Sequence, residues 1–331
     1  MHKYLVDMLE CPLCHGDLKW DIFKETNERI IQAEILCNDC NAKYPVEDEI
    51  ALFLTPKENR NDLWEQGNNQ LKKYFNENPE IEYKLLNKSL ESLNPADKFI
   101  RGMLLEEKGE YFKAMDVFKV AYKEIYTKEY IDCWNDEINY LCNYIDSDKP
   151  IIDLASGRCY LVEKLAKLKK NKIVATDFSP KVLKRDKLLL EHIGLYKNIS
   201  LIAFDGRLTP FKDGAIDILT SNLGLSNIEK PKDLIKELRR ITKGTFLSIN
   251  HFCNESDHDN VNLLKKFQLD TFLLESETID SFKKADFNIN ILNNLKGKAK
   301  PTPKGELIKD AEIDGFPIKE TILKWGIIEA K

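Results

Sequence analysis

The sequence lacks an apolar run of the roughly 18 residues that a membrane-spanning helix requires. It also lacks an excess of either charge: 50 basic residues stand against 55 acidic ones, and the net charge is -5. A general polyanion binder is therefore not expected, because affinity for phosphate needs clustered lysine and arginine. Asp7 and Glu10 interrupt the first ten residues, which disfavours a signal peptide. We expect a cytoplasmic globular protein whose 331 residues suit a little over two domains of about 150 residues.

The eight cysteines fall into two groups. Four form two Cys-x-x-Cys pairs, Cys11 with Cys14 and Cys37 with Cys40, and four are scattered. Two such pairs complete a tetrahedral four-cysteine zinc site with no open position, so the metal would be structural. Scattered thiols suit a reducing compartment and disfavour the alternative of two disulfides. We therefore predict a zinc ribbon over residues 1–56, with strands at residues 29–36 and 49–54.

The ribbon also carries a family resemblance. The two cysteine pairs, followed by Tyr44, Pro45 and an apolar strand ending at Leu54, resemble the small zinc-ribbon family that activates or precedes methyltransferases. The resemblance covers about the first 55 residues. It implies a methyltransferase further along the chain and leaves open a partner-binding role.

Residues 57–147 indicate a helical lid or linker segment. Pro56 and the polar residues up to 62 predict a linker, and apolar residues then recur at spacings of three and four with few glycines. The spacing of Gly102, Gly109 and Phe118 matches one tetratricopeptide repeat, and one repeat cannot bury its own face. We expect a helical hairpin covering the active site of the next domain. Four aromatic residues follow, and we expect most of them in the core: Tyr126, Tyr130, Trp134 and Tyr140.

Residues 148–331 alternate between strands and helices. Buried strands are predicted at residues 150–157, 172–177, 199–205, 215–221 and 244–250. The fold class is therefore α/β, a doubly wound Rossmann-like sheet with its ligand at the carboxyl ends of the strands. A C-terminal antiparallel hairpin within residues 313–330 would close this sheet.

Small and acidic residues follow the first three of these strands. Ala155, Ser156 and Gly157 form a turn whose backbone N–H groups can approach a ligand, and the next helix begins there. Asp177 lies 20 residues beyond Gly157 and can accept hydrogen bonds from ribose hydroxyls. Asp205 is placed to meet an adenine edge. The pattern predicts a nucleotide-like ligand.

This layout resembles the class I S-adenosylmethionine-dependent methyltransferases from about residue 148 onward. Residues 153–157 stand for their first motif, 174–177 for the second and 204–217 for the third and fourth. The resemblance implies S-adenosylmethionine as cofactor, with Asp153 and Gly157 at its methionine, Asp177 at its ribose and Asp205 at its adenine. The implied cofactor-binding residues are Asp153, Ala155, Ser156, Gly157, Asp177, Phe178, Asp205, Gly206 and Asn222.

The first motif departs from the family pattern, because Arg158 and Cys159 follow Gly157 where many relatives have small residues. This departure could weaken cofactor binding. A dinucleotide-binding dehydrogenase is disfavoured, since the sequence has no G-x-G-x-x-G. No general base is evident. His251 is a candidate, but a lone histidine is more often structural.

The sequence thus predicts a methyltransferase whose acceptor, a small molecule, a protein or RNA, is not identified. One alternative resembles the rRNA guanine-N1-type methyltransferases, which also place a zinc ribbon ahead of this domain. The acidic balance of charge does not favour RNA. The other alternative is a non-catalytic zinc-ribbon adaptor with a degenerate methyltransferase fold.

Overall fold

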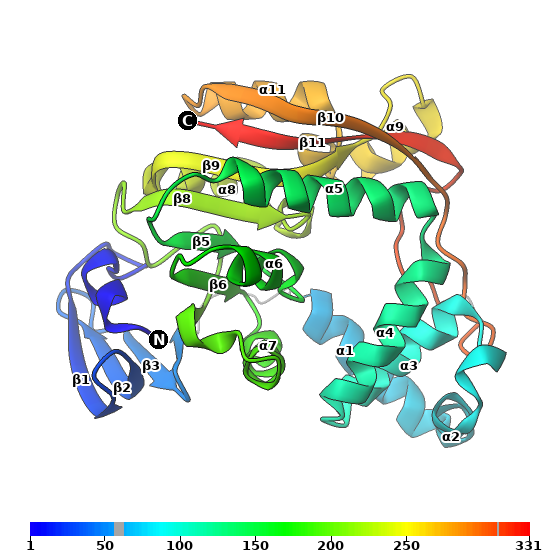
Figure 1. Ribbon diagram of the computed structural model, residues 1–331, viewed down its shortest axis with the longest axis horizontal. Helices are drawn as coiled ribbons and strands as arrows, with labels where there is room; N and C mark the ends of the chain where they lie inside the picture. The colour runs from blue at the N-terminus through cyan, green and yellow to red at the C-terminus, as the bar shows by residue number, and fades with distance from the viewer. Residues whose placement is uncertain (56–62, 310) are drawn as a thin grey trace.

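One continuous sheet organises the chain. The computed structural model describes residues 1–55, 63–309 and 311–331. Its 11 strands follow the order β1-β2-β3-β4-β7-β6-β5-β8-β9-β11-β10 (Figure 1). The strands are β1 (Leu18–Glu25), β2 (Ile30–Cys37), β3 (Lys43–Glu47), β4 (Ile50–Phe53), β5 (Ile151–Leu154), β6 (Ile173–Asp177), β7 (Ile199–Phe204), β8 (Ile216–Asn222), β9 (Thr242–Phe252), β10 (Ile289–Ala299) and β11 (Thr321–Ala330).

The centre of the sheet is parallel, from β4 through β7, β6, β5 and β8 to β9. Every residue of β5 and β7 is buried, because helices cover both faces. On one face lie α5 (Lys128–Tyr144), α6 (Tyr160–Leu168) and α7 (Pro180–His192). On the other lie α8 (Pro231–Ile241), α10 (Asp270–Leu273) and α11 (Glu275–Lys284). The predicted doubly wound sheet is confirmed, with β5 at the position where the strand order reverses.

The ribbon is part of this sheet, which the sequence did not predict. Strands β1 to β4 pair antiparallel, and β4 then pairs in parallel with β7, so that Ile50 is opposite Leu201. The aromatic rings of Tyr44 and Phe53 lie 5.1 Å apart and belong to the same core cluster as Phe204. The ribbon therefore covers what would be the β7 edge of the parallel sheet.

Four helices form a lobe beside the sheet: α1 (Leu63–Glu77), α2 (Pro79–Asn87), α3 (Pro95–Glu107) and α4 (Tyr111–Ile125). Helices α3 and α4 make the predicted hairpin, and α5 leads back across the sheet (Figure 1). A Cβ atom on Gly102 would stand 2.6 Å from the ring of Phe118, so only glycine permits this close packing. The predicted linker at residues 56–62 lies outside the described residues.

Strands β10 and β11 form the predicted C-terminal hairpin, but residues 313–320 are not strand. The connection between the two strands instead reaches the helical lobe. The backbone N–H groups of Glu306 and Leu307 donate to the carboxylate of Asp97 at 3.2 and 3.1 Å. The amide of Asn94 donates to the Lys304 carbonyl at 3.0 Å. This connection therefore completes a wall facing the sheet.

The remaining helix is α9 (His258–Lys266), which packs beside β9. Across residues 1–55, 63–309 and 311–331, none of the helices has the length and apolar character needed to cross a membrane.

Candidate functional site

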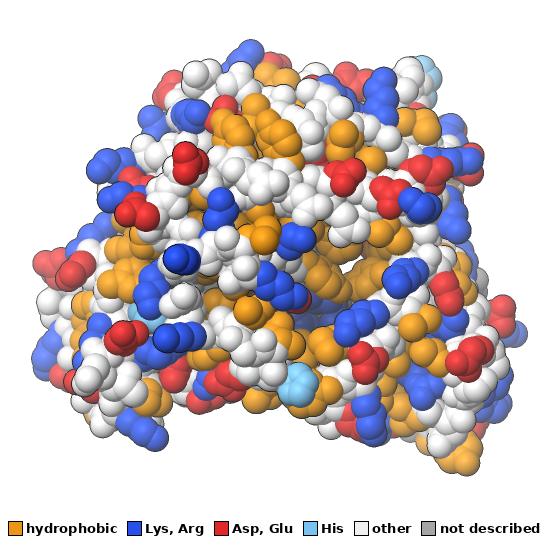
Figure 2. Space-filling model, in the orientation of Figure 1, with side chains coloured by type: hydrophobic (Ala, Val, Ile, Leu, Met, Phe, Trp, Pro, Cys, Tyr) orange, Lys and Arg blue, Asp and Glu red, His pale blue; other side chains and the backbone are white. Residues whose placement is uncertain are grey.

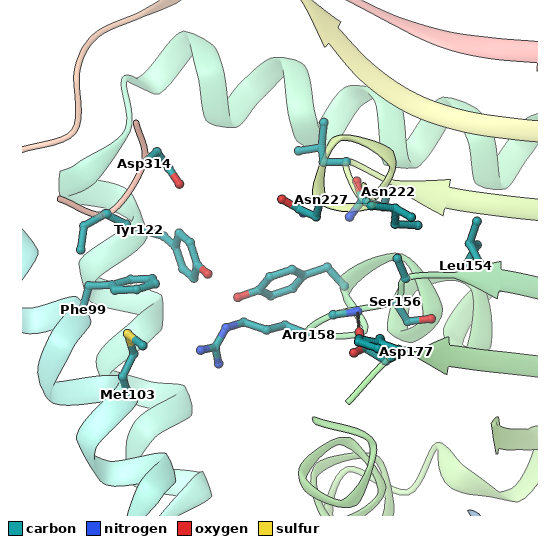
Figure 3. Close-up of a pocket in the computed structure, with 18 of the residues that line it drawn as sticks. Phe99, Met103, Tyr122, Leu154, Ser156, Arg158, Asp177, Asn222, Asn227 and Asp314 are labelled. Carbon is teal, nitrogen blue, oxygen red and sulfur yellow. Dashed lines mark hydrogen bonds between the residues drawn. The ribbon is translucent and has the colours of Figure 1, made fainter. Parts of the chain in front are cut away.

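A cavity of about 830 Å³ lies between the carboxyl ends of the central strands and the helical lobe. The surface is visibly hollowed between these two parts (Figure 2). One wall comes from the ends of β5 to β8, and the other from α3, α4, α5 and the β10–β11 connection. In Figure 3, Phe99, Met103, Tyr122 and Asp314 stand opposite Ser156, Asp177, Asn222 and Asn227. The two walls thus have different chemistry.

The turn after β5 has an unusual backbone. Ala155, Gly157 and Cys159 all have positive φ, at 52°, 54° and 57°, although only one of them is glycine. Each left-handed residue other than glycine costs about 1–2 kcal/mol, so surrounding contacts must hold this turn. The Ser156 N–H donates to the Thr176 carbonyl at 2.7 Å, and the Cys159 N–H donates to the Ser156 carbonyl at 2.8 Å. Turns of alternating handedness direct backbone N–H groups toward an anion.

Asp177 stands at the end of β6, beside this turn. Its Oδ2 accepts from the Gly157 N–H at 3.1 Å, and its Oδ1 accepts from the Ser179 N–H at 2.9 Å. The carboxylate is therefore oriented by the backbone on both sides and lines the cavity together with Phe178. Such a fixed carboxylate suits recognition of paired hydroxyl groups.

Asp153 does not line the cavity, in contrast to its predicted contact with the ligand. Its side chain is buried within the sheet, where Oδ1 accepts from the Thr220 hydroxyl at 2.7 Å. Burial raises the pKa of this carboxyl to about 6. Asp153 therefore lies behind the turn at residues 155–157, because its side chain is directed toward Thr220 of the neighbouring strand and not toward the cavity.

Asp205 and Gly206 follow β7 and line the cavity. Arg207 holds the Asp205 carboxylate: its Nη2 donates to Oδ2 at 2.5 Å, and its Nε donates to Oδ1 at 2.9 Å. Arg207 also lines the cavity. The charge of Asp205 is therefore balanced within the protein.

The second wall is aromatic. Tyr122 on α4, Tyr126 just after its end and Tyr130 on α5 stack in series, with ring centroids 5.8 and 4.7 Å apart. Trp134 and Tyr160 meet edge to face at 5.2 Å. All five line the cavity. Of the four aromatic residues expected mostly in the core, Tyr126, Tyr130 and Trp134 line the cavity and Tyr140 is exposed, so that expectation is wrong.

The two walls meet at Asn222, the last residue of β8. Its Oδ1 accepts from the Trp134 Nε1–H at 2.9 Å. This bond joins α5 to the strand end where ligand would bind. Asn222 therefore lies at the boundary between the turn after β5 and the aromatic wall.

The β10–β11 connection contributes Asp314 to the aromatic wall. The Tyr126 hydroxyl donates to Asp314 Oδ2 at 2.6 Å. Asp314 is exposed and lines the cavity, and the protein atoms packed near its carboxyl reduce its hydration, which raises its pKa. Nothing in the sequence indicated this residue, because its position depends on a long connection folding back onto the helical lobe.

Arg158 ties the helical hairpin to the turn after β5. Its Nη1 and Nη2 donate to the Glu106 carboxylate of α3 at 2.5 and 3.1 Å. The guanidinium also lies 3.7 Å from the centre of the Phe118 ring. Arg185 adds a bond from its Nη2 to the Gly157 carbonyl at 2.7 Å. The residue that departs from the family pattern therefore makes a connection between the two walls.

His251 does not line the cavity. It lies behind Tyr130, with ring centroids 5.9 Å apart, and burial lowers its pKa to about 4. A general base role for this histidine finds no support in its position.

The four paired cysteines come together at the other end of the molecule. Their sulfur atoms all lie within 4.8 Å of one another. The Sγ atoms of Cys11 and Cys40 are 3.6 Å apart, and those of Cys14 and Cys37 are 3.4 Å apart. Four thiolates around zinc at about 2.3 Å would stand about 3.8 Å from one another, so this donor set fits the metal.

Two family models match separate parts of the chain. A methyltransferase domain matches residues 152–246, and a Trm112p-like protein matches residues 2–49. The first match contains the ends of β5 to β8 that line the cavity, and the second contains the four clustered cysteines.

Curated relatives include the ubiquinone/menaquinone biosynthesis C-methyltransferase UbiE of Wigglesworthia glossinidia brevipalpis, 30% identical over 112 residues. That of Cronobacter sakazakii is 26% identical over 104 residues. The alignments cover 33% and 31% of this chain and 44% and 41% of the relatives, so less than half of each relative is spanned.

Among solved structures, the YcgJ protein of Bacillus subtilis has a TM-score of 0.48 at 14% identity, covering 59% of this chain and 97% of that one. A putative methyltransferase of Bacillus halodurans has a TM-score of 0.47 at 18% identity, covering 59% and 98%. The assignment rests on the two family matches and on the order of the strands in the sheet. The chain contains a domain of the class I S-adenosylmethionine-dependent methyltransferase family, joined to an N-terminal Trm112p-like zinc-ribbon domain.

Proposed function

We propose that this chain transfers a methyl group from S-adenosylmethionine to a small molecule held against the aromatic wall. The observation that carries the proposal is a cavity bounded by two walls of unlike chemistry. Small-molecule sites measure about 300–1,000 Å³, so a cavity of about 830 Å³ has room for a cofactor and a modest acceptor side by side.

The residues after β5, β6 and β7 would hold the cofactor. The small residues of the turn at 155–157 leave room for its methionine portion, the N-terminus of α6 favours its carboxylate, and Asp177 offers two oriented oxygens to its ribose. Phe178, Gly206 and Asn222 complete this side of the cavity. When bound, the cofactor supplies an activated methyl group, and the protein's main task is to align the acceptor with it.

The domain boundaries follow from the same proposal. Residues 1–56 form the ribbon, 57–147 the helical lid and 148–331 the methyltransferase unit. The lid supplies Tyr122, Tyr126 and Trp134 to the cavity, so it contributes directly to the site of the acceptor. The curated relatives are named as C-methyltransferases. An acceptor methylated on carbon is therefore the alternative to the nitrogen acceptor that is argued below.

Calorimetric titration with S-adenosylmethionine tests the proposal. We expect the wild-type protein to bind it and Asp177→Asn to weaken binding by about tenfold or more, because asparagine replaces one acceptor oxygen by a donor. Asp280→Asn, an exposed substitution on α11, serves as the matched control and should leave the affinity unchanged. Absence of binding to the wild-type protein would refute the enzyme and leave the adaptor role.

We also propose one structural zinc ion per chain, held by Cys11, Cys14, Cys37 and Cys40. With four thiolates around it, the metal would have no open position for substrate. Elemental analysis of the purified protein should find stoichiometric zinc that Cys11→Ser loses. Full occupancy in that variant would contradict the assignment.

A further inference from the structure

Acidic side chains outnumber basic ones in the lining of the cavity. Five acidic residues line it against two arginines, and none of the described lining residues is lysine or histidine. The acidic residues are Asp177, Asp205, Glu229, Glu312 and Asp314. Arg207 is bound to Asp205, Arg158 is bound to Glu106, and Glu312 forms an ion pair with Lys304, which does not line the cavity. Clefts lined by one sign of charge concentrate ligands of the opposite sign.

One of these acids stands on the aromatic wall, away from the residues proposed to hold the cofactor. Asp314 is fixed by its backbone, because its N–H donates to the Thr302 hydroxyl at 3.1 Å. Its Oδ2 is held by the Tyr126 hydroxyl. Figure 3 shows the carboxyl on the same side as Tyr122 and Phe99, across from Asn222. Asp314 is exposed, so its carboxylate is open to a ligand, and an opposite charge within about 4–6 Å favours the charged form of a carboxyl group.

The aromatic residues around Asp314 suit the same ligand. Tyr122, Tyr126 and Tyr130 present a stacked series, and Trp134 stands against Tyr160. The electron-rich faces of such rings attract cations, and their apolar surface accepts a hydrocarbon body. An anionic acceptor would instead meet several carboxylates in a cavity whose two arginines are already bound to carboxylates.

We propose that the acceptor is a small primary or secondary amine on an apolar or aromatic body, bound in its protonated form with Asp314 as counter-ion. This inference rests on the proposed function, since it names the substrate class of that site. The aromatic wall holds the apolar body, and Asp314 selects the ammonium group.

The chemistry balances with Asp314 as the immediate proton acceptor. The ammonium group gives one proton to the carboxylate, which later passes it to solvent. The nitrogen lone pair then forms the new N–CH3 bond as the methyl–sulfur bond breaks, with its electron pair remaining on sulfur. The products are the methylated ammonium ion, S-adenosylhomocysteine and one released proton.

The experiment begins with the cofactor product, so that two kinds of failure are separable. S-adenosylhomocysteine is titrated by calorimetry; if it does not bind, the proposed function itself is wrong. With that site saturated, three probes of matched shape are compared: benzylamine, benzyl alcohol and benzoate. We expect benzylamine to bind about tenfold more tightly than benzyl alcohol, and benzoate to bind most weakly.

Asp314→Asn tests the residue. It should weaken benzylamine binding by about tenfold while benzyl alcohol and S-adenosylhomocysteine change by less than about twofold. Asp280→Asn is the matched control and should change none of the three affinities. A loss shared by all three ligands would mark a structural effect, and the wild-type comparison of the probes would then decide.

If S-adenosylhomocysteine binds and benzylamine binds no better than benzyl alcohol, or does not bind, the amine assignment is overturned. Preference for the alcohol would point to a neutral acceptor such as a carbon nucleophile on a ring. Unchanged benzylamine affinity in Asp314→Asn would remove Asp314 from the proposal and with it the stated mechanism of selection.

Discussion

The ion pair between Glu106 and Arg158 offers the sharpest test of how the helical lobe supports the cofactor side. Glu106 lies on α3, and Arg158 lies in the turn after β5, 52 residues further along the chain. Their side chains are 16% and 11% exposed, so the pair is largely shielded from solvent. Glu106→Gln removes the negative charge and keeps the shape, so Arg158 loses its ion pair with Glu106, and Arg185, 3.6 Å from the same carboxylate, loses one as well.

The magnitude follows from this geometry. Removing one partner of a fully buried pair costs about 3–5 kcal/mol, whereas hydrogen bonds to charged groups contribute about 1.5–3 kcal/mol. Because the pair is partly exposed and the glutamine still offers an amide oxygen, we expect Glu106→Gln to lower the unfolding free energy by about 2 kcal/mol, within the range for hydrogen bonds to charged groups. Because Arg158 adjoins the left-handed residues Gly157 and Cys159, part of this loss should appear as a decrease of about threefold to tenfold in S-adenosylhomocysteine affinity.

The assay is a double-mutant cycle with Arg158→Met, read by chemical unfolding and by calorimetry. Glu110→Gln is the control, since Glu110 pairs with Lys113 on an exposed helix surface where such pairs contribute little. We expect a coupling energy of at least about 1 kcal/mol between positions 106 and 158. Coupling below about 0.5 kcal/mol, or cofactor affinity unaffected by either change, would refute the tie between hairpin and turn.

Three further predictions concern stability. Burial raises the pKa of Glu137 to about 7, so the folded protein binds this proton more tightly than the unfolded chain does, and the unfolding free energy falls as pH rises toward 7. Glu137→Gln should therefore be more stable than wild type by up to about 3 kcal/mol at pH 8 and equally stable at pH 4. Urea unfolding of both proteins at the two pH values measures this difference. Removing zinc with a chelator, or changing Cys11 to Ser, should lower the unfolding free energy by several kcal/mol and speed amide hydrogen exchange in β4, which pairs with β7. Cys133→Ser is the control and should do neither. Amide protection of β4 that survives the loss of metal would contradict this prediction. Gly102→Ala should lower the unfolding free energy by about 1–3 kcal/mol because its Cβ would meet the Phe118 ring, and an unchanged Tm would show that the hairpin can widen.

The sequence itself determined the local chemistry. Two Cys-x-x-Cys pairs require a short knuckle each, and four thiolates have one natural tetrahedral partner. Buried strands alternating with helices permit few arrangements, so the order of β5 to β9 and the carboxyl-end position of Asp177 and Asp205 were predictable. The hairpin of α3 and α4 followed from the small residues at Gly102 and Gly109, which limit how its helices pack.

Tertiary structure decided the contacts that join distant segments. Nothing local in β4 shows that it pairs in parallel with β7, because both strands are simply apolar. Apolar periodicity could not separate the cavity-facing Tyr130 and Trp134 of α5 from core residues, since both kinds occupy the inward face of a helix. The sequence pattern also could not show that the Asp153 side chain is buried against the neighbouring strand and does not face the cavity.

Contacts between distant segments also determine the surroundings of Arg158 and Asp314, on which the tests above depend. Arg158 meets Glu106 across 52 residues, and Asp314 meets Tyr126 across 188 residues. The sequence gives the charge and size of a side chain, but its contact partner depends on which segments the folded chain brings together. Local pattern therefore predicted the motifs that we propose hold the cofactor, and only the folded chain forms the aromatic wall, because that wall is assembled from separate parts of the sequence.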